Sequence, residues 1–353
     1  MIDTDEKLAA FLPSLRDAEW IALDTEADSL YAYPEKICLL QFSVAGRDEL
    51  IDPLSPMNLG PLWAAVQRHE LIMHGADYDL RLLRKGYRLV PKAVFDTMIA
   101  SRLLGCRQFG LNNLLLKYLG VTLEKGPQKA NWAKRPLTDR MTAYALNDVR
   151  HLKALADILK AQLRDLGRLA WHEESCTRQV ADCAKHPVPD PDLVWRVKGS
   201  HRLDPAALGV LRELWRWREL EAVHSNKPPY FVLATEKMVE IAAATVDARP
   251  MTEILPRHLT PRRRDGILAA VEQGLATDKR PAILRQHNKR PTEAESRRAR
   301  ELERRRDQRA TELDIDPTLI ASRSTLMDLA RDWDKYRAGL MSWQRALLDK
   351  AAG

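Results

Sequence analysis

The first hundred residues alternate short apolar runs with segments of helical periodicity, and this order restricts the chain to α/β folds. Three apolar runs, 20–24, 37–44 and 49–52, are separated by turn-prone residues, which favours an antiparallel meander. The patterns that follow predict a helix over 62–69, a strand over 71–74, a helix over 79–85 that ends at Gly86, and a strand over 94–96. From Thr97 onward nearly all segments have helical periodicity, so we expect an α/β domain over 1–170 followed by helical parts.

The helical remainder carries its own start and stop signals. The Pro-rich stretch 186–191 has the composition of a stiff linker. Asp204 before Pro205 predicts the start of a helix that runs to about Ser225. The remaining predicted helix starts are Thr235, Thr252 and Thr260, and the sequence 315–317 interrupts a last helical region over 290–351.

The composition excludes several protein classes. A chain of 353 residues is long enough for two or three domains. No apolar run reaches the ~18 residues of a membrane span, and the polar start does not resemble a secretory signal. The four cysteines form no CxxC pair, which disfavours zinc ribbons and disulfide frameworks, so we expect a reducing, cytoplasmic environment.

The net charge of +7 is unevenly distributed along the chain. Residues 285–309 hold ten basic and five acidic side chains, and so account for most of the excess. A basic surface suits a polyanionic partner, although an ordinary solvated helix would have the same composition.

Three acidic motifs lie in apolar surroundings, and each has an ordinary explanation when taken alone. Asp24 and Glu26 are two residues apart on a predicted strand and therefore share one face, but such a pair also arises by chance. Asp79 follows a buried strand, where Asp77 or Asp79 could cap the next helix. Asp148 lies one helical turn after Tyr144, where it could form a solvated ion pair.

Taken together, the motifs indicate a metal-dependent hydrolytic centre. Four carboxylates from distant segments supply the hard oxygen ligands that Mg²⁺ or Mn²⁺ prefers. Two such ions about 4 Å apart can stabilise the attacking and leaving oxygens of a phosphodiester.

These motifs resemble motifs I, II and III of the DEDD superfamily of 3′→5′ exonucleases. Tyr144, four residues before Asp148, is similar to the tyrosine branch of that superfamily, whereas Ala143 stands where the other branch has histidine. The segments 94–105, 111–121 and 131–152 resemble the ribonuclease D family. The resemblance implies an RNase H-like fold for the first part, a mixed sheet flanked by helices.

The helical remainder also resembles that family. The segments 211–222 and 231–242 are similar to an HRDC domain, and 313–330 is similar to a second HRDC-like helical domain. The expected division is an exonuclease domain over 1–170, a connecting helix and linker over 171–199, an HRDC domain over 200–282 and a second helical domain over 283–353. Trp215 and Trp217 diverge on their helix, so we expect only one of them to face the HRDC core, and the other to be exposed for RNA stacking or to pack against the exonuclease domain.

The resemblance assigns roles to the acidic residues. It implies that Asp24, Glu26 and Asp148 hold a first metal ion, and that Asp24 and Asp79 hold a second. Tyr144 would position the attacking water, because a tyrosine with a pKa near 10 is a poor base at neutral pH.

Six further residues are predicted to contact the substrate. Thr25 could offer its backbone to the 3′ end, and His74 could meet the substrate or pack in the core. The remaining members of this group are Lys125, Lys129, Trp132 and Arg135.

The sequence therefore predicts a 3′→5′ exoribonuclease of the ribonuclease D type. It would act as a monomer away from membranes, trim the 3′ ends of structured RNAs such as tRNA precursors, and release nucleoside 5′-monophosphates. Two alternatives remain open at this point: a DNA exonuclease of the same chemistry, and an RNA-binding protein that has lost catalysis.

Overall fold

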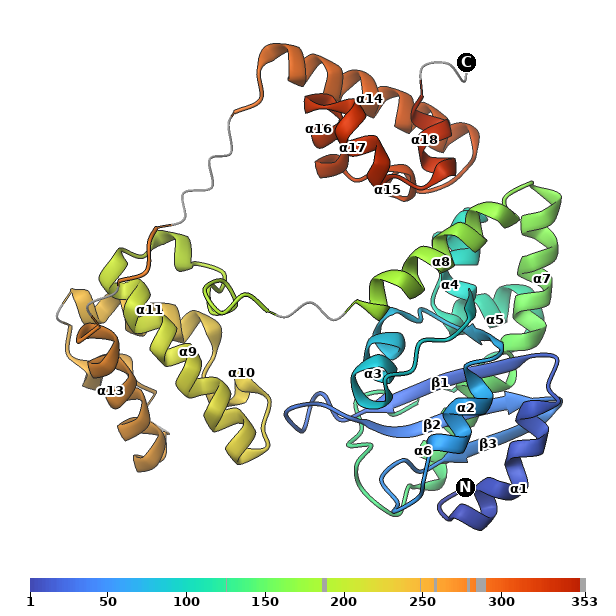
Figure 1. Ribbon diagram of the computed structural model, residues 1–353, viewed down its shortest axis with the longest axis horizontal. Helices are drawn as coiled ribbons and strands as arrows, with labels where there is room; N and C mark the ends of the chain where they lie inside the picture. The colour runs from blue at the N-terminus through green and yellow to red at the C-terminus, as the bar shows by residue number, and fades with distance from the viewer. Residues whose placement is uncertain are drawn as a thin grey trace. The chain divides into compact units, whose positions relative to one another are not determined.

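The structure is a computed structural model that describes residues 1–124, 126–185, 189–247, 249–256, 259–277, 280–283 and 290–349 (Figure 1). The contacts divide the chain into two compact units. The first contains Met1–Ala27, Ile37–Lys185 and Lys289–Gly353, and the second contains Asp28–Lys36 and His186–Asn288.

A five-stranded mixed sheet forms the centre of the first unit. Its strands are β1 (Ile21–Ala27), β2 (Ile37–Val44), β3 (Arg47–Ile51), β4 (Glu70–Met73) and β5 (Ala93–Asp96), in the order β3-β2-β1-β4-β5. The pairs β1/β2 and β2/β3 are antiparallel, which confirms the predicted meander, and β1/β4 and β4/β5 are parallel. The predicted mixed sheet flanked by helices is confirmed.

Helices cover both faces of this sheet. They are α1 (Asp5–Arg16), α2 (Gly60–Val66), α3 (Asp77–Tyr87), α4 (Thr97–Leu103), α5 (Leu111–Leu119), α6 (Asp139–Arg150), α7 (Leu152–Asp165) and α8 (Leu169–Ala184). Side chains of β1 alternate between the faces. Ile21 and Leu23 lie in the core with α1, α2 and α3, whereas Ala22 lies in the core with α4, α5 and α7.

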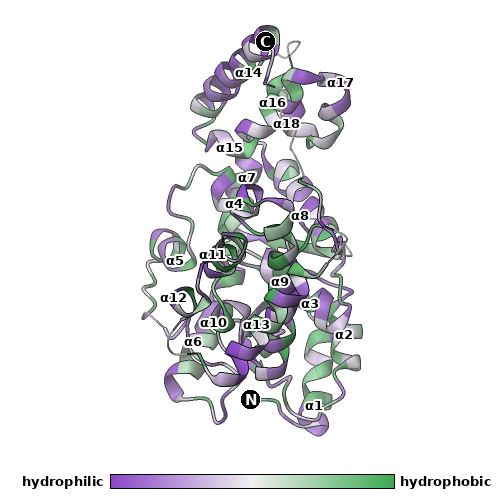
Figure 2. Cartoon of the chain, turned by 90° about the vertical axis from the view of Figure 1, so that its left-hand side faces the viewer, coloured by the Kyte–Doolittle hydropathy of each residue, from purple (hydrophilic) through white to green (hydrophobic). Residues whose placement is uncertain are grey.

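The C-terminal helices belong to the same unit. They are α14 (Glu293–Glu312), α15 (Pro317–Ile320), α16 (Arg323–Arg331), α17 (Trp333–Tyr336) and α18 (Ser342–Leu348), with a 3₁₀ turn over Arg337–Gly339. Their apolar side chains share a core with α4, α5 and α7. Trp171 of α8 stacks on Trp343 of α18 with ring centroids 5.0 Å apart. Figure 2 shows that α14 is strongly hydrophilic along its length.

The second unit is helical where it is described beyond 189. It contains a 3₁₀ turn over Ser200–Arg202 and the helices α9 (Pro205–Ser225), α10 (Pro229–Val232), α11 (Thr235–Val246), α12 (Met251–Ile254) and α13 (Pro261–Leu275). The prediction that Asp204 caps α9 is confirmed, because its carboxylate accepts hydrogen bonds from the backbone of Ala206 and Ala207. Thr260 caps α13 in the same way.

Several local predictions are wrong. Gly86 does not end α3, which continues to Tyr87 and stops where Arg88 adopts a left-handed φ of 56°. Helix α11 does begin at Thr235, as predicted, but Ala234 and not Thr235 is its N-cap, and α12 begins at Met251, one residue before the predicted start at Thr252. Residues 186–188 of the predicted linker lie outside the described residues.

The prediction for the two tryptophans of α9 is also wrong. Trp215 and Trp217 are both half-buried against the core of the second unit. The two side chains point in different directions from α9. Both are nevertheless covered, because other helices of the second unit pack around a wide part of the circumference of α9. The α13 backbone comes close enough that a Cβ at Gly266 would lie 2.2 Å from Nε1 of Trp217.

Candidate functional site

The first two acidic residues lie near the carboxyl end of β1. Asp24 and Glu26 alternate with Thr25, so both carboxylates point to one face of the sheet and Thr25 points to the other. Asp24 pairs with Gln41 of β2 in the sheet register, and the Gln41 amide Nε2 lies 3.4 Å from Asp24 Oδ2. The pairing of β1 with β2 therefore places the Gln41 side chain against the Asp24 carboxylate.

Asp79 reaches the same edge of the sheet from α3. The strand β4 that precedes α3 runs parallel to β1, so the carboxyl ends of both strands meet there. Asp79 is 8% exposed in the first turn of α3, and its Oδ1 accepts a hydrogen bond of 2.5 Å from the Thr25 hydroxyl. Strand β1 thus supplies the Asp24 and Glu26 carboxylates on one face of the sheet. On the other face, its Thr25 hydroxyl orients the Asp79 carboxylate.

The alternative that Asp77 or Asp79 caps α3 is wrong. The N-cap is Ala76, which has no side-chain acceptor, and Asp77 pairs with Arg81 at 2.9 Å. The backbone N–H groups at the start of α3 are instead bound by the carboxylate of Asp96, at the end of β5. Its carboxylate receives the backbone N–H groups of Gly75 at 3.0 Å and Ala76 at 2.9 Å.

Helix α6 brings the last acidic residue to this edge. Tyr144 and Asp148 are one turn apart, and the phenol lies close enough to the Asp148 carboxylate for each group to shift the pKa of the other. The nearby side chain of Gln128 acts against the rise in the pKa of this phenol. Gly126 packs directly against the ring, because a Cβ at this glycine would lie 1.5 Å from Tyr144 Cδ2. The Tyr144 ring is therefore fixed on one side by a backbone that only glycine allows.

The carboxylates of Asp24, Glu26 and Asp148 form one cluster, with an oxygen of each within 4.8 Å of the others. Burial, followed by the charge of Asp148 and then Asp79, raises the pKa of Glu26 to about 8. Burial raises the pKa of Asp148 to about 7 and that of Asp79 to about 6. Burial and the neighbouring carboxylates also raise the pKa of Asp24 well above its usual range.

Such a cluster is costly without a counter-charge. Buried like charges raise one another's pKa, and no lysine or arginine is paired with any of these four carboxylates among the described residues. Hard oxygen ligands at this spacing fit a divalent cation such as Mg²⁺ or Mn²⁺. The alternative of a solvated ion pair at Asp148 is wrong, since the neighbouring Arg150 pairs with Asp48 at 2.6 Å.

Burial and the charge of Asp148 keep the pKa of Tyr144 far above neutrality. The phenol is therefore protonated at neutral pH and can donate a hydrogen bond, while its role in orienting the attacking water stays a prediction.

His74 lies between the acidic site and the core. Its Nδ1 is 2.9 Å from the Thr97 hydroxyl, which in turn donates to the Met73 carbonyl at 3.1 Å. This arrangement leaves Nδ1 as the donor toward Thr97. Burial lowers the pKa of His74, so the ring is neutral near pH 7.

Two of the predicted substrate residues are structural. Trp132 is 1% exposed and lies in the core beside Tyr144, with ring centroids 6.1 Å apart. Arg135 forms a bidentate pair with Asp52 at 2.6 and 2.7 Å and donates to the Cys38 carbonyl at 2.7 Å. The Trp132 ring is thus shielded from a substrate, while the Arg135 side chain is 25% exposed and is held in place by these bonds.

The other substrate predictions stay predictions. The backbone of Thr25 lies between two of the acidic residues, while its hydroxyl is occupied by Asp79. Lys129 is exposed, and Lys125 lies outside the described residues.

Three positioning residues were missed in the sequence. Asp96 accepts hydrogen bonds at the start of α3, Gln41 contacts Asp24, and Gln128 lies near Tyr144. Only Asp96 carried a signal, because an acidic residue directly after an apolar strand and before a helix is a common N-cap.

The comparisons with known proteins agree with this geometry. Residues 1–164 match the 3'-5' exonuclease family, and residues 207–248 match the HRDC domain. The fold and the acidic site thus define a 3′→5′ exonuclease domain followed by an HRDC domain.

Named relatives specify the family. The ribonuclease D of Gluconacetobacter diazotrophicus is 30% identical over 100% of this chain and 91% of its own length. That of Zymomonas mobilis is 34% identical over 69% of this chain and 63% of its own length. The Escherichia coli RNase D crystal structure superposes with a TM-score of 0.76 at 24% identity, covering 100% of this chain and 99% of that one, which supports the fold.

The chain belongs to the ribonuclease D family and is a 3′→5′ exoribonuclease. This finding favours an exoribonuclease over the two alternatives left open by the sequence, a DNA exonuclease and an inactive RNA-binding protein. In the described part of the chain, no helix has both the length and the apolar composition needed to cross a membrane.

Proposed function

We propose that Asp24, Glu26, Asp79 and Asp148 hold two divalent cations, Mg²⁺ or Mn²⁺. Asp24, Glu26 and Asp148 would bind one, and Asp24 and Asp79 the other. The observation that carries this proposal is the buried, mutually repelling carboxylate cluster, which lacks a basic partner among the described residues. When bound, the cations activate water and neutralise the charge that develops on the phosphate.

The chain's own residues prepare the site for this chemistry. The phenol of Tyr144 lies beside Asp148 and is protonated, so it can donate a hydrogen bond to a water or substrate oxygen. Thr25 and Gln41 keep Asp79 and Asp24 from rotating away. The backbone of Thr25 and the neutral ring of His74 are proposed to contact the 3′-terminal nucleotide.

We also propose that the substrates are RNAs with 3′ extensions, such as tRNA precursors, shortened to release nucleoside 5′-monophosphates. The Escherichia coli relative is described as an exoribonuclease involved in structured RNA processing, which supports this substrate class. The chain is proposed to act as a monomer in the cytoplasm. Its proposed parts are 1–170 (exonuclease), 171–199 (connection), 200–282 (HRDC) and 283–353 (second helical domain).

The test uses the full chain with an RNA hairpin that carries a labelled 3′ extension, beside a DNA of equal sequence. The proposal expects shortening from the 3′ end with Mg²⁺ or Mn²⁺, release of nucleoside 5′-monophosphates, slower loss of the DNA, and no reaction in EDTA. Asp24→Asn should abolish shortening, whereas Asp165→Asn, on the exposed side of α7, is the matched control. Digestion by Asp24→Asn at the control's rate with Mn²⁺ would refute the site.

A further inference from the structure

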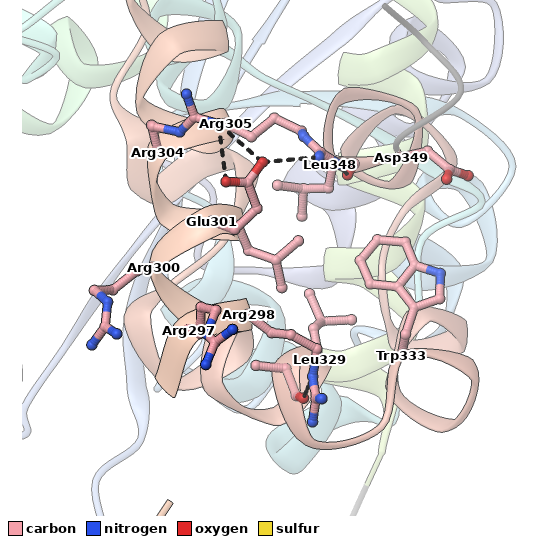
Figure 3. A pocket seen from close by; sticks show the side chains of 12 residues that line it. Arg297, Arg298, Arg300, Glu301, Arg304, Arg305, Leu329, Trp333, Leu348 and Asp349 are labelled. Carbon is pink, nitrogen blue, oxygen red and sulfur yellow. Dashed lines mark hydrogen bonds and ion pairs between the residues drawn. The ribbon is translucent and has the colours of Figure 1, made fainter. Parts of the chain in front are cut away.

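The C-terminal helices enclose a cavity of about 670 Å³ (Figure 3). On one side it is lined by α14, and on the other by residues of α16, α17 and the end of α18. We propose that this cavity binds one unpaired nucleotide of the RNA substrate. Its base would lie in the apolar interior beside Trp333, and its phosphates would lie against Arg297 and Arg300. The proposal rests on the proposed function, because it takes RNA as the ligand.

The interior of the cavity is apolar. Leu302 of α14, Leu329 of α16 and Leu348 of α18 are buried and line it, and the half-buried Trp333 ring forms part of the wall. Ligand cavities of about 300–1,000 Å³ accept molecules of nucleotide size. Bases stack on aromatic rings without sequence preference, because every base has a π-face. The interior therefore suits a nucleobase.

Two arginines at the wall are already held by the protein. Arg298 donates to the Ala330 carbonyl at 2.6 Å, and Arg305 donates to the Leu348 carbonyl at 2.7 Å. These bonds attach α14 to the ends of α16 and α18. Arg298 and Arg305 thus build the cavity and are poor candidates for new contacts with a phosphate.

Two other arginines remain available to a ligand. Arg297 and Arg300 are exposed, line the cavity, and have no hydrogen bond or ion pair with any residue that the structure describes. They are three residues apart on α14 and so lie on adjoining positions of one helix face. Figure 3 shows both guanidinium groups directed away from the apolar interior. Guanidinium groups bind phosphate oxygens in bidentate geometry.

The charge around the cavity favours an anion. Five arginines line it, against the two carboxylates of Glu301 and Asp349, and Glu301 is engaged with Arg304 at 2.9 Å. An apolar peptide would fill the interior but leave Arg297 and Arg300 unused. A nucleotide uses both parts, with an aromatic base inside and phosphates outside.

The test measures RNA binding by the full chain in EDTA, with a fluorescent single-stranded RNA and anisotropy as the readout. Trp333→Leu should weaken binding about tenfold, which is within the range measured for loss of one stacked base. Arg297→Glu/Arg300→Glu should weaken it at least as much and lower the salt slope by about 1.4, the value for two phosphate contacts to a single strand. Arg290→Glu/Arg323→Glu is the charge-matched control outside the cavity, with an expected change below about twofold.

Further variants separate binding from folding and from catalysis. Trp333→Phe keeps an aromatic ring and should restore most of the binding, whereas a role in packing alone would make binding follow thermal stability. Hydrolysis of a dinucleotide with Mg²⁺ reports on the acidic site alone and should be unchanged in all cavity variants. If the wild-type chain with Mg²⁺ shortens neither the dinucleotide nor the labelled 3′ extension, the proposed function fails, whatever the cavity does.

RNA affinity of the cavity variants equal to that of the control would overturn the proposal. That result would mean that the cavity takes another occupant, such as an acidic protein segment.

Discussion

The hydroxyl of Thr25 donates a hydrogen bond of 2.5 Å to the carboxylate of Asp79, although 54 residues separate them. This bond joins strand β1 to helix α3 at the edge where the acidic residues meet. Because Thr25 stands between Asp24 and Glu26, one three-residue segment supplies two carboxylates and orients a third.

We predict that Thr25→Val reduces both activity and stability. Valine keeps the shape of threonine but leaves the buried Asp79 oxygen without its donor, which costs about 1–3 kcal/mol of unfolding free energy. Loss of an outer contact to a metal-binding carboxylate costs about 10–100-fold in metal affinity or activity. Urea unfolding and the Mg²⁺ dependence of kcat measure the two effects. Thr25→Ser, which retains the hydroxyl, is the control, and equal losses in both variants would contradict the role of the hydrogen bond.

We predict that the metal-free protein becomes less stable as the pH rises from about 5 to 9. The pKa values of Asp79, Asp148 and Glu26 are raised to about 6, 7 and 8, while an unfolded carboxyl group titrates near pH 4. A carboxyl with a raised folded pKa stabilises the fold at low pH, and this contribution is lost as the pH rises through the folded value.

Thermal unfolding in EDTA across this pH range measures the loss. Saturating Mn²⁺ should reverse it, because the cation binds the ionised carboxylates. Asp24→Asn should flatten the profile in EDTA. If the stability of the metal-free protein instead increased up to pH 9, the proposed repulsion among the site carboxylates would be wrong.

We predict that Asp96→Asn destabilises the first unit by about 2–4 kcal/mol, because a buried carboxylate that accepts several N–H groups becomes an amide with its own donors. Asp96 is fully buried and accepts from Gly75, Ala76 and Met98, and from Gln179 at 3.2 Å. Since these bonds fix the start of α3, Asp79 should shift and kcat should fall as well. Urea unfolding and RNA shortening, with Asp165→Asn as the control, measure both effects. A stable variant with full activity would refute this role.

We predict that Tyr144→Phe lowers kcat by about 10²-fold, the size of effect expected when a reacting group loses its orientation. The ring still packs on Gly126 and Trp132, so the unfolding free energy should change little. The affinity for Mn²⁺ should also be retained, because the carboxylates are unchanged. Loss of Mn²⁺ binding in this variant would assign Tyr144 to holding Asp148 and not to catalysis.

The sequence predicted the parts of this molecule that depend on local pattern. Strand β2 was placed correctly at both ends, because eight successive buried residues bounded by turns leave little choice. Asp24, Glu26, Asp79, Tyr144 and Asp148 were singled out because their three motifs together resemble the exonuclease superfamily, whereas each motif alone had an ordinary explanation.

The errors concern residues whose partners are far away in the chain. Arg135 looked like a substrate ligand because its partner Asp52 lies 83 residues earlier. Trp132 was placed among the substrate residues because nothing local shows that it lies in a buried cluster with Cys38, Leu39 and Leu50. The left-handed Arg88 that ends α3 has no sequence signal, whereas Gly86 has a false one.

The most direct measurement is a calorimetric titration of the metal-free full chain with Mn²⁺ at pH 7.5, beside Asp24→Asn and Asp165→Asn. We predict two bound ions with release of protons in the wild-type chain and in Asp165→Asn, and loss of both ions in Asp24→Asn. RNA shortening should begin at the Mn²⁺ concentrations that fill the site. Full RNA shortening in EDTA, or equal Mn²⁺ binding by Asp24→Asn, would contradict the account.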